Sequence, residues 1–122
     1  MKNFSALLSC MFIVSCTAAT NSEQTDSTYG FTEKNAIKVG GVTEGPLNQR
    51  AYLNSLTGPN GEEVYFERSG SCCPFKTSKG FLGSGMLDRY AVTYQGKKDT
   101  VYLYLNMYDS GKLKAPVGFK MK

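Results

Sequence analysis

The second half of the chain alternates apolar with polar residues, which is the pattern of half-buried β-strands. Residues 100–108 show it best, because aliphatic and methionine side chains alternate there with tyrosines and an asparagine. Residues 62–68 and 86–94 repeat the alternation, and shorter stretches of it occur at 36–42 and 113–121. The side chains of the three long segments that we expect to face the core are Val64, Phe66, Tyr90, Val92, Tyr94, Val101, Leu103, Leu105 and Met107.

The final segment, residues 113–121, differs from the others in its polar positions. Lysines and Pro116 occupy them, and both residue types keep a strand from pairing with a further chain. We therefore expect a strand at the edge of the sheet. Its expected inward side chains are Leu113, Ala115, Val117, Phe119 and Met121.

One segment has helical spacing instead. Gly45-Pro46 opens it, because proline suits the first helical position, where its missing N–H is not needed. Gly58-Pro59 closes it, since glycine followed by proline stops a helix. The predicted apolar stripe of this helix consists of Leu47, Tyr52, Leu53 and Leu56.

The order of these elements is one strand, one helix and then four strands. It predicts a single α+β domain over residues 36–122, in which the helix packs on one face of a four- to five-stranded antiparallel sheet. The order resembles that of cystatin-type folds. The resemblance implies no protease inhibition, because Val39-Gly40-Gly41 stands where an inhibitor loop has a Gln-x-Val-x-Gly pattern.

The N-terminal pattern indicates an export signal. Lys2 precedes an apolar run of about 13 residues, which is shorter than the ~20 residues that a membrane span needs. The run ends in Ile13-Val14-Ser15-Cys16, which resembles the lipobox of a bacterial lipoprotein signal peptide. The resemblance implies that residues 1–15 are removed and that Cys16 becomes the acylated, palmitate-bearing first residue. An ordinary cleaved signal with incidental cysteines is the alternative.

The residues that follow Cys16 are small and polar and have little to bury. The sequence therefore predicts a lipidated, flexible tether over residues 16–35, ahead of the domain. Because Thr17 rather than aspartate follows the cysteine, a resemblance to enterobacterial sorting implies the outer membrane. The expected location is the bacterial cell envelope, with the lipid as the contact with the membrane.

Composition removes several classes of function. The 122-residue chain has no histidine, so Ser-His-Asp and Cys-His nucleophiles and histidine-rich zinc sites are excluded. The formal net charge is +4, and +3 without Lys2. Arg50, Arg68 and Arg89 are the only arginines and are scattered, which is not the footprint of a nucleic-acid-binding protein. No motif indicates a cofactor.

The most unusual segment of the domain is residues 69–77, in which Cys72 and Cys73 are adjacent. Adjacent α-carbons lie ~3.8 Å apart, below the ~4.4 Å at which the usual disulfide range begins. A vicinal disulfide, two separate thiols and a bond to another protein all remain open. Paired thiolates favour soft metals such as Cu(I), so the pair is a candidate redox or metal site. A rigid turn, or small buried hydrophobic side chains ahead of a proline, is the alternative.

A row of tyrosines is the candidate binding surface. If the registers hold, Tyr65, Tyr102, Tyr104 and Tyr108 lie on the sheet face opposite the core. Exposed aromatic rows bind sugars, peptides and partner proteins. Tyrosine also stabilises sheets through cross-strand pairs, which is the alternative account.

Three strings carry a wider resemblance: GPNGEEVYFERSGSCCPFKT, GMLDRYAVTYQG and VYLYLNMYDSGKLKAPVGF. From Gly58 to Phe119 they resemble a family of small uncharacterised bacterial envelope lipoproteins, for which the resemblance implies no mechanism. Such sequences are sometimes named deoxyphosphooctonate aldolase. That chemistry resembles barrel enzymes of ~250 residues, whereas removal of residues 1–15 leaves 107 of the 122 residues here. Length therefore argues against this name.

Three hypotheses remain. The first is a non-catalytic envelope lipoprotein that binds a partner protein or a surface polymer. The second is a thiol-based redox sensor or soft-metal binder that uses Cys72 and Cys73. The third is a small enzyme with Lys76, Asp88 or Arg89 as its charged groups. No spacing of residues supports the third, and we favour the first.

Overall fold

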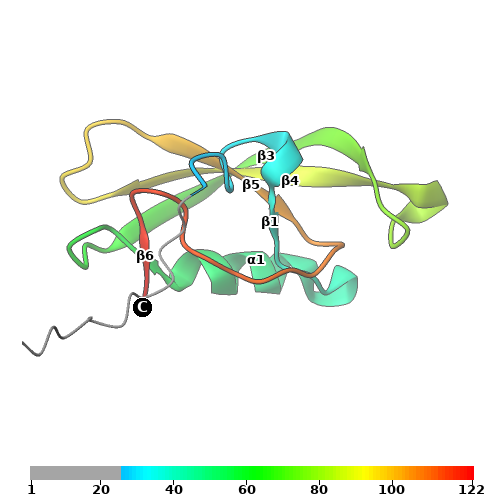
Figure 1. Cartoon of the computed structure of the whole chain (residues 1–122), viewed down its shortest axis with the longest axis horizontal. Coiled ribbons are helices and arrows are strands. Elements are labelled where there is room, and N and C mark those ends of the chain that lie inside the picture. Colours follow the sequence, from blue (N-terminus) through cyan, green and yellow to red (C-terminus); the bar gives the residue numbers. More distant parts are fainter. Residues whose placement is uncertain (1–25) are drawn as a thin grey trace, which may run out of the picture.

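The computed structural model describes residues 26–122, which form two layers (Figure 1). Within this part of the chain, one α-helix lies on one face of a four-stranded sheet of order β1-β5-β4-β3. The helix is α1 (Gly45–Asn54), and the strands are β1 (Ile37–Lys38), β5 (Val101–Asn106), β4 (Ser84–Tyr94) and β3 (Val64–Lys76). A separate two-stranded sheet consists of β2 (Leu56–Thr57) and β6 (Lys120–Met121). The short 3₁₀ helices are η1 (Glu33–Asn35), η2 (Val42–Glu44) and η3 (Phe81–Gly83).

The α+β class, with one helix packed on a sheet, is confirmed. The alternation at residues 62–68, 86–94 and 100–108 corresponds to β3, β4 and β5, which pair antiparallel. The sheet as a whole is mixed, because β1 pairs with β5 in the parallel direction.

The core lies between α1 and the sheet. Val92, Leu103 and Leu105 of the sheet and Leu53 of the helix are fully enclosed, with 0% exposure. The buried cluster consists of Tyr29, Ile37, Tyr52, Leu53, Leu56, Tyr90, Val92, Leu103, Leu105 and Phe119. Further side chains that were expected to face inward pack at its edge: Val64, Phe66, Tyr94 and Val101.

The helix is shorter than predicted. It begins at Gly45 as expected but ends at Asn54, ahead of Gly58. Ser55 caps it, and Leu56 already belongs to β2, which pairs with β6. Pairing with a strand from the other end of the chain therefore ends the helix before the Gly-Pro stop is reached.

The buried face of α1 differs from the predicted apolar stripe at two positions. Leu47 is 58% exposed, whereas Gln49 is 1% exposed and faces the sheet. Tyr52, Leu53 and Leu56 are buried as predicted. The helix therefore turns a polar side chain into the core.

The edge strand predicted over residues 113–121 is wrong. Only β6 is a strand, and it pairs with β2 outside the main sheet. The segment before it runs along α1 instead, where the Tyr52 hydroxyl donates to the Lys114 carbonyl at 2.6 Å (Figure 1). Pro116, expected outward, is buried, as is Phe119. The expected inward side chains that are exposed are Leu113, Val117 and Met121.

β3 is longer than predicted. Residues 69–77, for which a rigid turn was one alternative, continue the strand to Lys76 and stay paired with β4. The register shifts between Arg68 and Gly70 and again between Cys72 and Pro74, as at β-bulges that each insert one extra residue. The hairpin therefore extends past the end of α1, with η3 at its tip (Figure 1).

The domain begins before residue 36. Residues 26–35, expected as part of the tether, are folded: Tyr29 is 8% exposed, and the Gly30 carbonyl accepts from the Tyr104 N–H at 2.8 Å. η1 lies on the side of the sheet away from α1 (Figure 1). The expected signal peptide, Cys16 and the tether up to residue 25 lie outside the described residues. Between residues 26 and 122, none of the helices has the length and apolar character needed to cross a membrane.

Candidate functional site

The outer face of the sheet, away from α1, brings two of the predicted tyrosines together. Side chains of β4 alternate between the two faces, and Tyr90 enters the core, so Ala91 and Thr93 lie on the outer face. On one side Tyr102 of β5 pairs with Ala91, and on the other Tyr65 of β3 pairs with Thr93. Both tyrosines therefore share the outer face.

These side chains are accessible, and a positive charge lies over one of them. Tyr65 is 52% exposed and Tyr102 is 47% exposed, and strand spacing places their α-carbons about 12 Å apart. The Arg89 guanidinium lies over the Tyr102 ring, 4.7 Å from its centroid, which is a cation–π contact. Tyr104 pairs with Arg89 and is half-buried. We call Tyr65, Arg89, Tyr102 and Tyr104 the tyrosine face.

Tyr108 does not join the tyrosine face. Its ring packs edge to face on Phe75, with centroids 5.7 Å apart. It also lies across Gly85, where an added Cβ would meet the ring at 2.8 Å. Along β4, Gly85 is about 20 Å from Ala91, the partner of Tyr102. Tyr108 therefore supports the far part of the hairpin.

Cys72 and Cys73 form a vicinal disulfide with α-carbons 3.7 Å apart. Cys72 pairs with Leu87, and Cys73 is the extra residue of the second bulge, with φ 60°. The Cys73 Sγ lies 2.9 Å from Oε1 of Glu33 in η1. A disulfide sulfur has no proton to donate, so this contact is a hydrogen bond only when Cys73 is a thiol. The segment is part of a strand and not a turn, and both cysteine side chains are half-buried.

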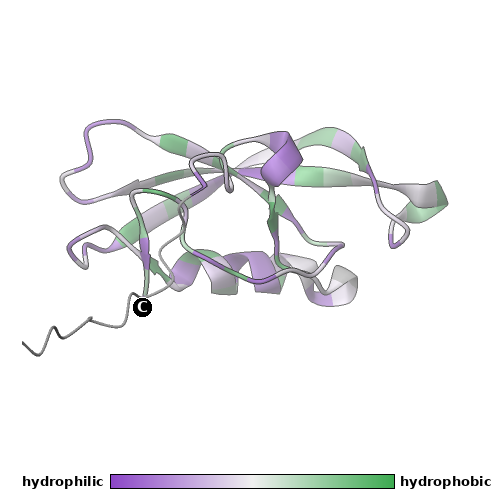
Figure 2. Ribbon diagram, viewed as in Figure 1, coloured by the Kyte–Doolittle hydropathy of each residue, from purple (hydrophilic) through white to green (hydrophobic). Residues whose placement is uncertain are grey.

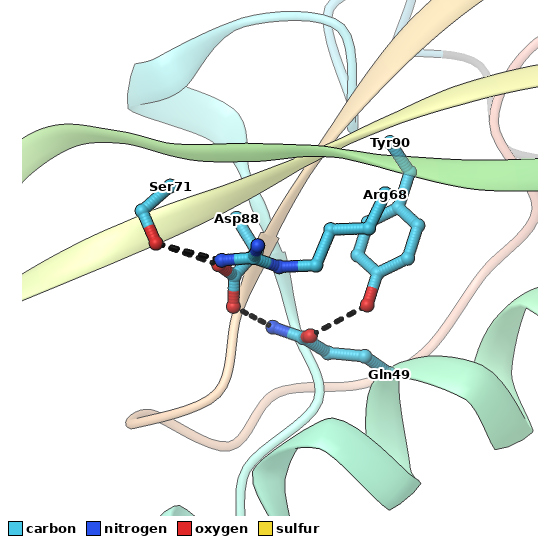
Figure 3. A network of polar contacts seen from close by, with 5 residues as sticks. All are labelled: Gln49, Arg68, Ser71, Asp88 and Tyr90. Atoms are coloured by element: carbon cyan, nitrogen blue, oxygen red, sulfur yellow. Dashed lines mark hydrogen bonds and ion pairs between the residues drawn. The ribbon is translucent and has the colours of Figure 1, made fainter.

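A buried polar network, which was not predicted from the sequence, lies between α1 and the hairpin (Figure 3). Gln49 donates to Asp88 Oδ2 at 2.7 Å, and the Tyr90 hydroxyl donates to Gln49 Oε1 at 2.9 Å. Arg68 donates to Asp88 Oδ1 at 2.8 Å and to Ser71 Oγ at 2.7 Å. Asp88 is 6% exposed, whereas half of the Arg68 side chain reaches solvent. A polar residue three positions before Tyr52, within the apolar stripe, is the signal that could have identified Gln49.

The first bulge of β3 makes this network possible. Residues three positions apart on a regular strand point to opposite faces. Because the bulge adds Ser69, Arg68 and Ser71 both lie opposite inward residues of β4, Tyr90 and Asp88. Both side chains therefore reach the same carboxylate (Figure 3).

The charged groups considered for catalysis do not converge. Asp88 faces α1, its neighbour Arg89 lies over Tyr102 on the outer face, and Lys76 is exposed at the end of β3. Among residues 26–122, no group of three or more cysteine, aspartate and glutamate side chains could hold a metal ion.

Burial changes the titration of three tyrosines. Desolvation raises the pKa of Tyr52 far above its usual value, and Tyr29 beside it adds to the shift. Both hydroxyls are hydrogen-bonded to the backbone of Lys114: the Tyr52 hydroxyl donates to its carbonyl, and the Tyr29 hydroxyl accepts from its N–H at 3.2 Å. Burial also raises the pKa of Tyr90, and the Asp88 charge adds to it. These hydroxyls therefore hold the fold as neutral groups.

Comparison of the chain with models of protein families, with curated proteins and with solved structures finds no match. Function is therefore inferred from the geometry of the tyrosine face and the cysteine pair.

Proposed function

We propose that this chain is a lipid-anchored protein of the bacterial envelope that binds a partner protein through the tyrosine face, without catalysis. The observation that supports it best is the exposure of Tyr65 and Tyr102 on one sheet face, with Arg89 over one ring. Tyrosine and arginine are enriched in protein interfaces and dominate their binding energy. Tyrosine offers a large, rigid contact area at low entropic cost.

A protein partner fits this surface better than a surface polymer. Ala91 separates Tyr102 from Glu67 across the sheet, so the face carries an acidic side chain as well as Arg89. Charges of both signs beside aromatic rings fix the orientation of a protein partner through complementary charges. Binding to a purified envelope polymer is the competing outcome.

The anchor rests on Cys16 and the resemblance of the residues before it to a lipobox. Mass spectrometry of the protein from cells is expected to find an acylated Cys16 as the first residue. An intact N-terminus, or a soluble form with unmodified Cys16, would contradict the lipid anchor. It would not bear on partner binding by the tyrosine face.

The tyrosine face is tested with the double substitution Tyr65→Ser/Tyr102→Ser. After cross-linking in cells, we expect this variant to lose capture of the partner by at least about tenfold, because both aromatic contacts are removed. Tyr102→Phe should retain capture, since it keeps the ring under Arg89. Leu47→Ser is the matched control, because Leu47 is exposed on α1, in the other layer. Unchanged capture by the double variant would contradict the proposal.

The second candidate function is a thiol redox response, favoured by the disulfide at the bulge and by its contact with Glu33. Reduction by a dithiol reagent transfers two electrons and two protons to the pair and gives two thiols, one of which can donate to Glu33. Alkylation followed by mass spectrometry is expected to find the pair oxidised in cells and reversibly reduced on treatment. A pair that never reacts under native conditions would contradict a redox role.

A further inference from the structure

The end of the β3–β4 hairpin exposes large apolar side chains. Phe81 is 85% exposed and Leu82 is 89% exposed, and Met86 nearby is 42% exposed. Figure 2 shows this apolar end beyond the rest of the domain. Leu82 also has φ 54°, in the left-handed region that a branched side chain rarely adopts. The fold therefore presents these side chains to solvent instead of burying them.

Within the segment that forms the tip, the charged side chains have one sign. Residues 74–87 contain Lys76 and Lys79 and no acidic residue. Both lysines are exposed. One carboxylate, Asp109, lies at the base of the tip. Its bonds from Asn106 and from the Thr77 hydroxyl at 2.9 Å lower its pKa, and the charge of Lys79 adds to this. The apolar tip is thus flanked by cations.

We propose that this tip, Phe81 and Leu82 flanked by Lys76 and Lys79, inserts into the surface of a membrane that contains anionic lipid. Two side chains supply roughly 300 Å² of apolar surface, whereas a stable protein interface takes about 800 Å² from each partner. A bilayer needs no complementary pocket. Lysines next to inserted apolar side chains gain from the negative potential of anionic headgroups.

This contact is separate from the tyrosine face and does not require lipid on Cys16. Insertion of apolar side chains adds to any attachment that lipid provides. It also sets the orientation. With η3 at the bilayer, Ala91 of β4 and its partner Tyr102 lie about 25 Å away along the strand, clear of the headgroups.

The absence of tryptophan from the chain allows a direct test. The full chain with Phe81→Trp is mixed with vesicles of brominated phosphatidylcholine and phosphatidylglycerol, and the bromine atoms quench only an inserted indole. We expect a blue-shifted, quenched emission. Tyr102→Trp is the matched control, which is expected to show neither effect even if the chain is anchored by lipid.

Further variants separate the two parts of the tip. Adding Lys76→Gln/Lys79→Gln to the Phe81→Trp chain should weaken insertion about tenfold, and vesicles of phosphatidylcholine alone should have a similar effect. Thermal melting followed by circular dichroism checks that each variant is folded. Absence of quenching, equal quenching in Tyr102→Trp, or equal quenching on neutral and anionic vesicles would overturn the proposal. A blue shift without vesicles that grows with protein concentration would overturn it in favour of self-association.

Discussion

The two parts of the β3–β4 hairpin differ in what they bury. The near part, residues 64–68 and 90–94, supplies Phe66, Tyr90 and Val92 to the core against α1. The far part, residues 70–76 and 84–89, supplies no side chain to that cluster but holds the vicinal disulfide and leads to the exposed tip. One continuous pair of strands therefore packs into the core at one end and leaves large apolar side chains exposed at the other. The boundary lies at the first bulge, where Arg68 meets Asp88.

The largest expected effect of a substitution is in the near part and its neighbour β5. Leu103→Ala removes a fully buried side chain and should lower the free energy of unfolding by about 2–5 kcal/mol. Leu82→Ala at the tip should change it by less than about 0.5 kcal/mol. Urea unfolding followed by circular dichroism measures both. Comparable losses for the two variants would contradict the division between the two parts.

Alkaline pH should lower the free energy of unfolding through the buried tyrosines. The folded-state pKa of Tyr52 is raised by burial, so this hydroxyl stabilises the fold fully below its unfolded pKa near 10. Above that pH the unfolded chain ionises first, and stability should fall by about 1.4 kcal/mol per pH unit from this group. Urea midpoints between pH 8 and 11 test this in wild type and Tyr52→Phe. An equal slope in the two proteins would show that Tyr52 does not carry the effect.

A substitution at Gln49 should disrupt the polar network that lies where the two parts of the hairpin meet. Gln49→Leu leaves the Tyr90 hydroxyl without its acceptor and Asp88 without one donor, which should cost about 1–3 kcal/mol of unfolding free energy. Asn54→Leu, on an exposed position of the same helix, is the control. A stabilised Gln49→Leu variant would mean that the network is dispensable for packing.

The disulfide should contribute little to stability. It closes a ring of two adjacent residues, so it restrains little of the unfolded chain, and Cys72→Ser/Cys73→Ser should cost only about 1 kcal/mol. Thermal melting in oxidising buffer provides the measurement. A loss as large as that of Leu103→Ala would indicate that the pair is a structural element of the core.

Side-chain alternation predicts the long strands well, because residues 64–68, 90–94 and 101–106 follow a regular register with one face buried. It fails beyond Arg68, since each bulge shifts the two-residue alternation by one position. The rest of β3 therefore does not show the pattern of a strand. It also fails at 113–121, where alternate residues mimic a strand although Pro116 packs against the domain without strand pairing. Neither failure has a local signal, because both depend on contacts with distant residues.

The candidate sites divide in the same way. The position of Tyr65 and Tyr102 follows from the registers of the regular strands, so the sequence could place them on one face. Tyr108 lies after the end of β5, where alternation no longer determines its direction. The position of Gln49 within the apolar stripe is visible in the sequence, but its partner Asp88 across the core is not. The exposure of Phe81 and Leu82 depends on the length of the hairpin, which alternation does not predict.

Site-specific photo-cross-linking in cells shows whether the tyrosine face contacts a partner protein. A photo-reactive phenylalanine derivative is placed at position 102 and, in a second chain, at position 47 on α1. We predict a discrete, protease-sensitive adduct from position 102 alone. No adduct at position 102, or the same adducts from both positions, would contradict the account.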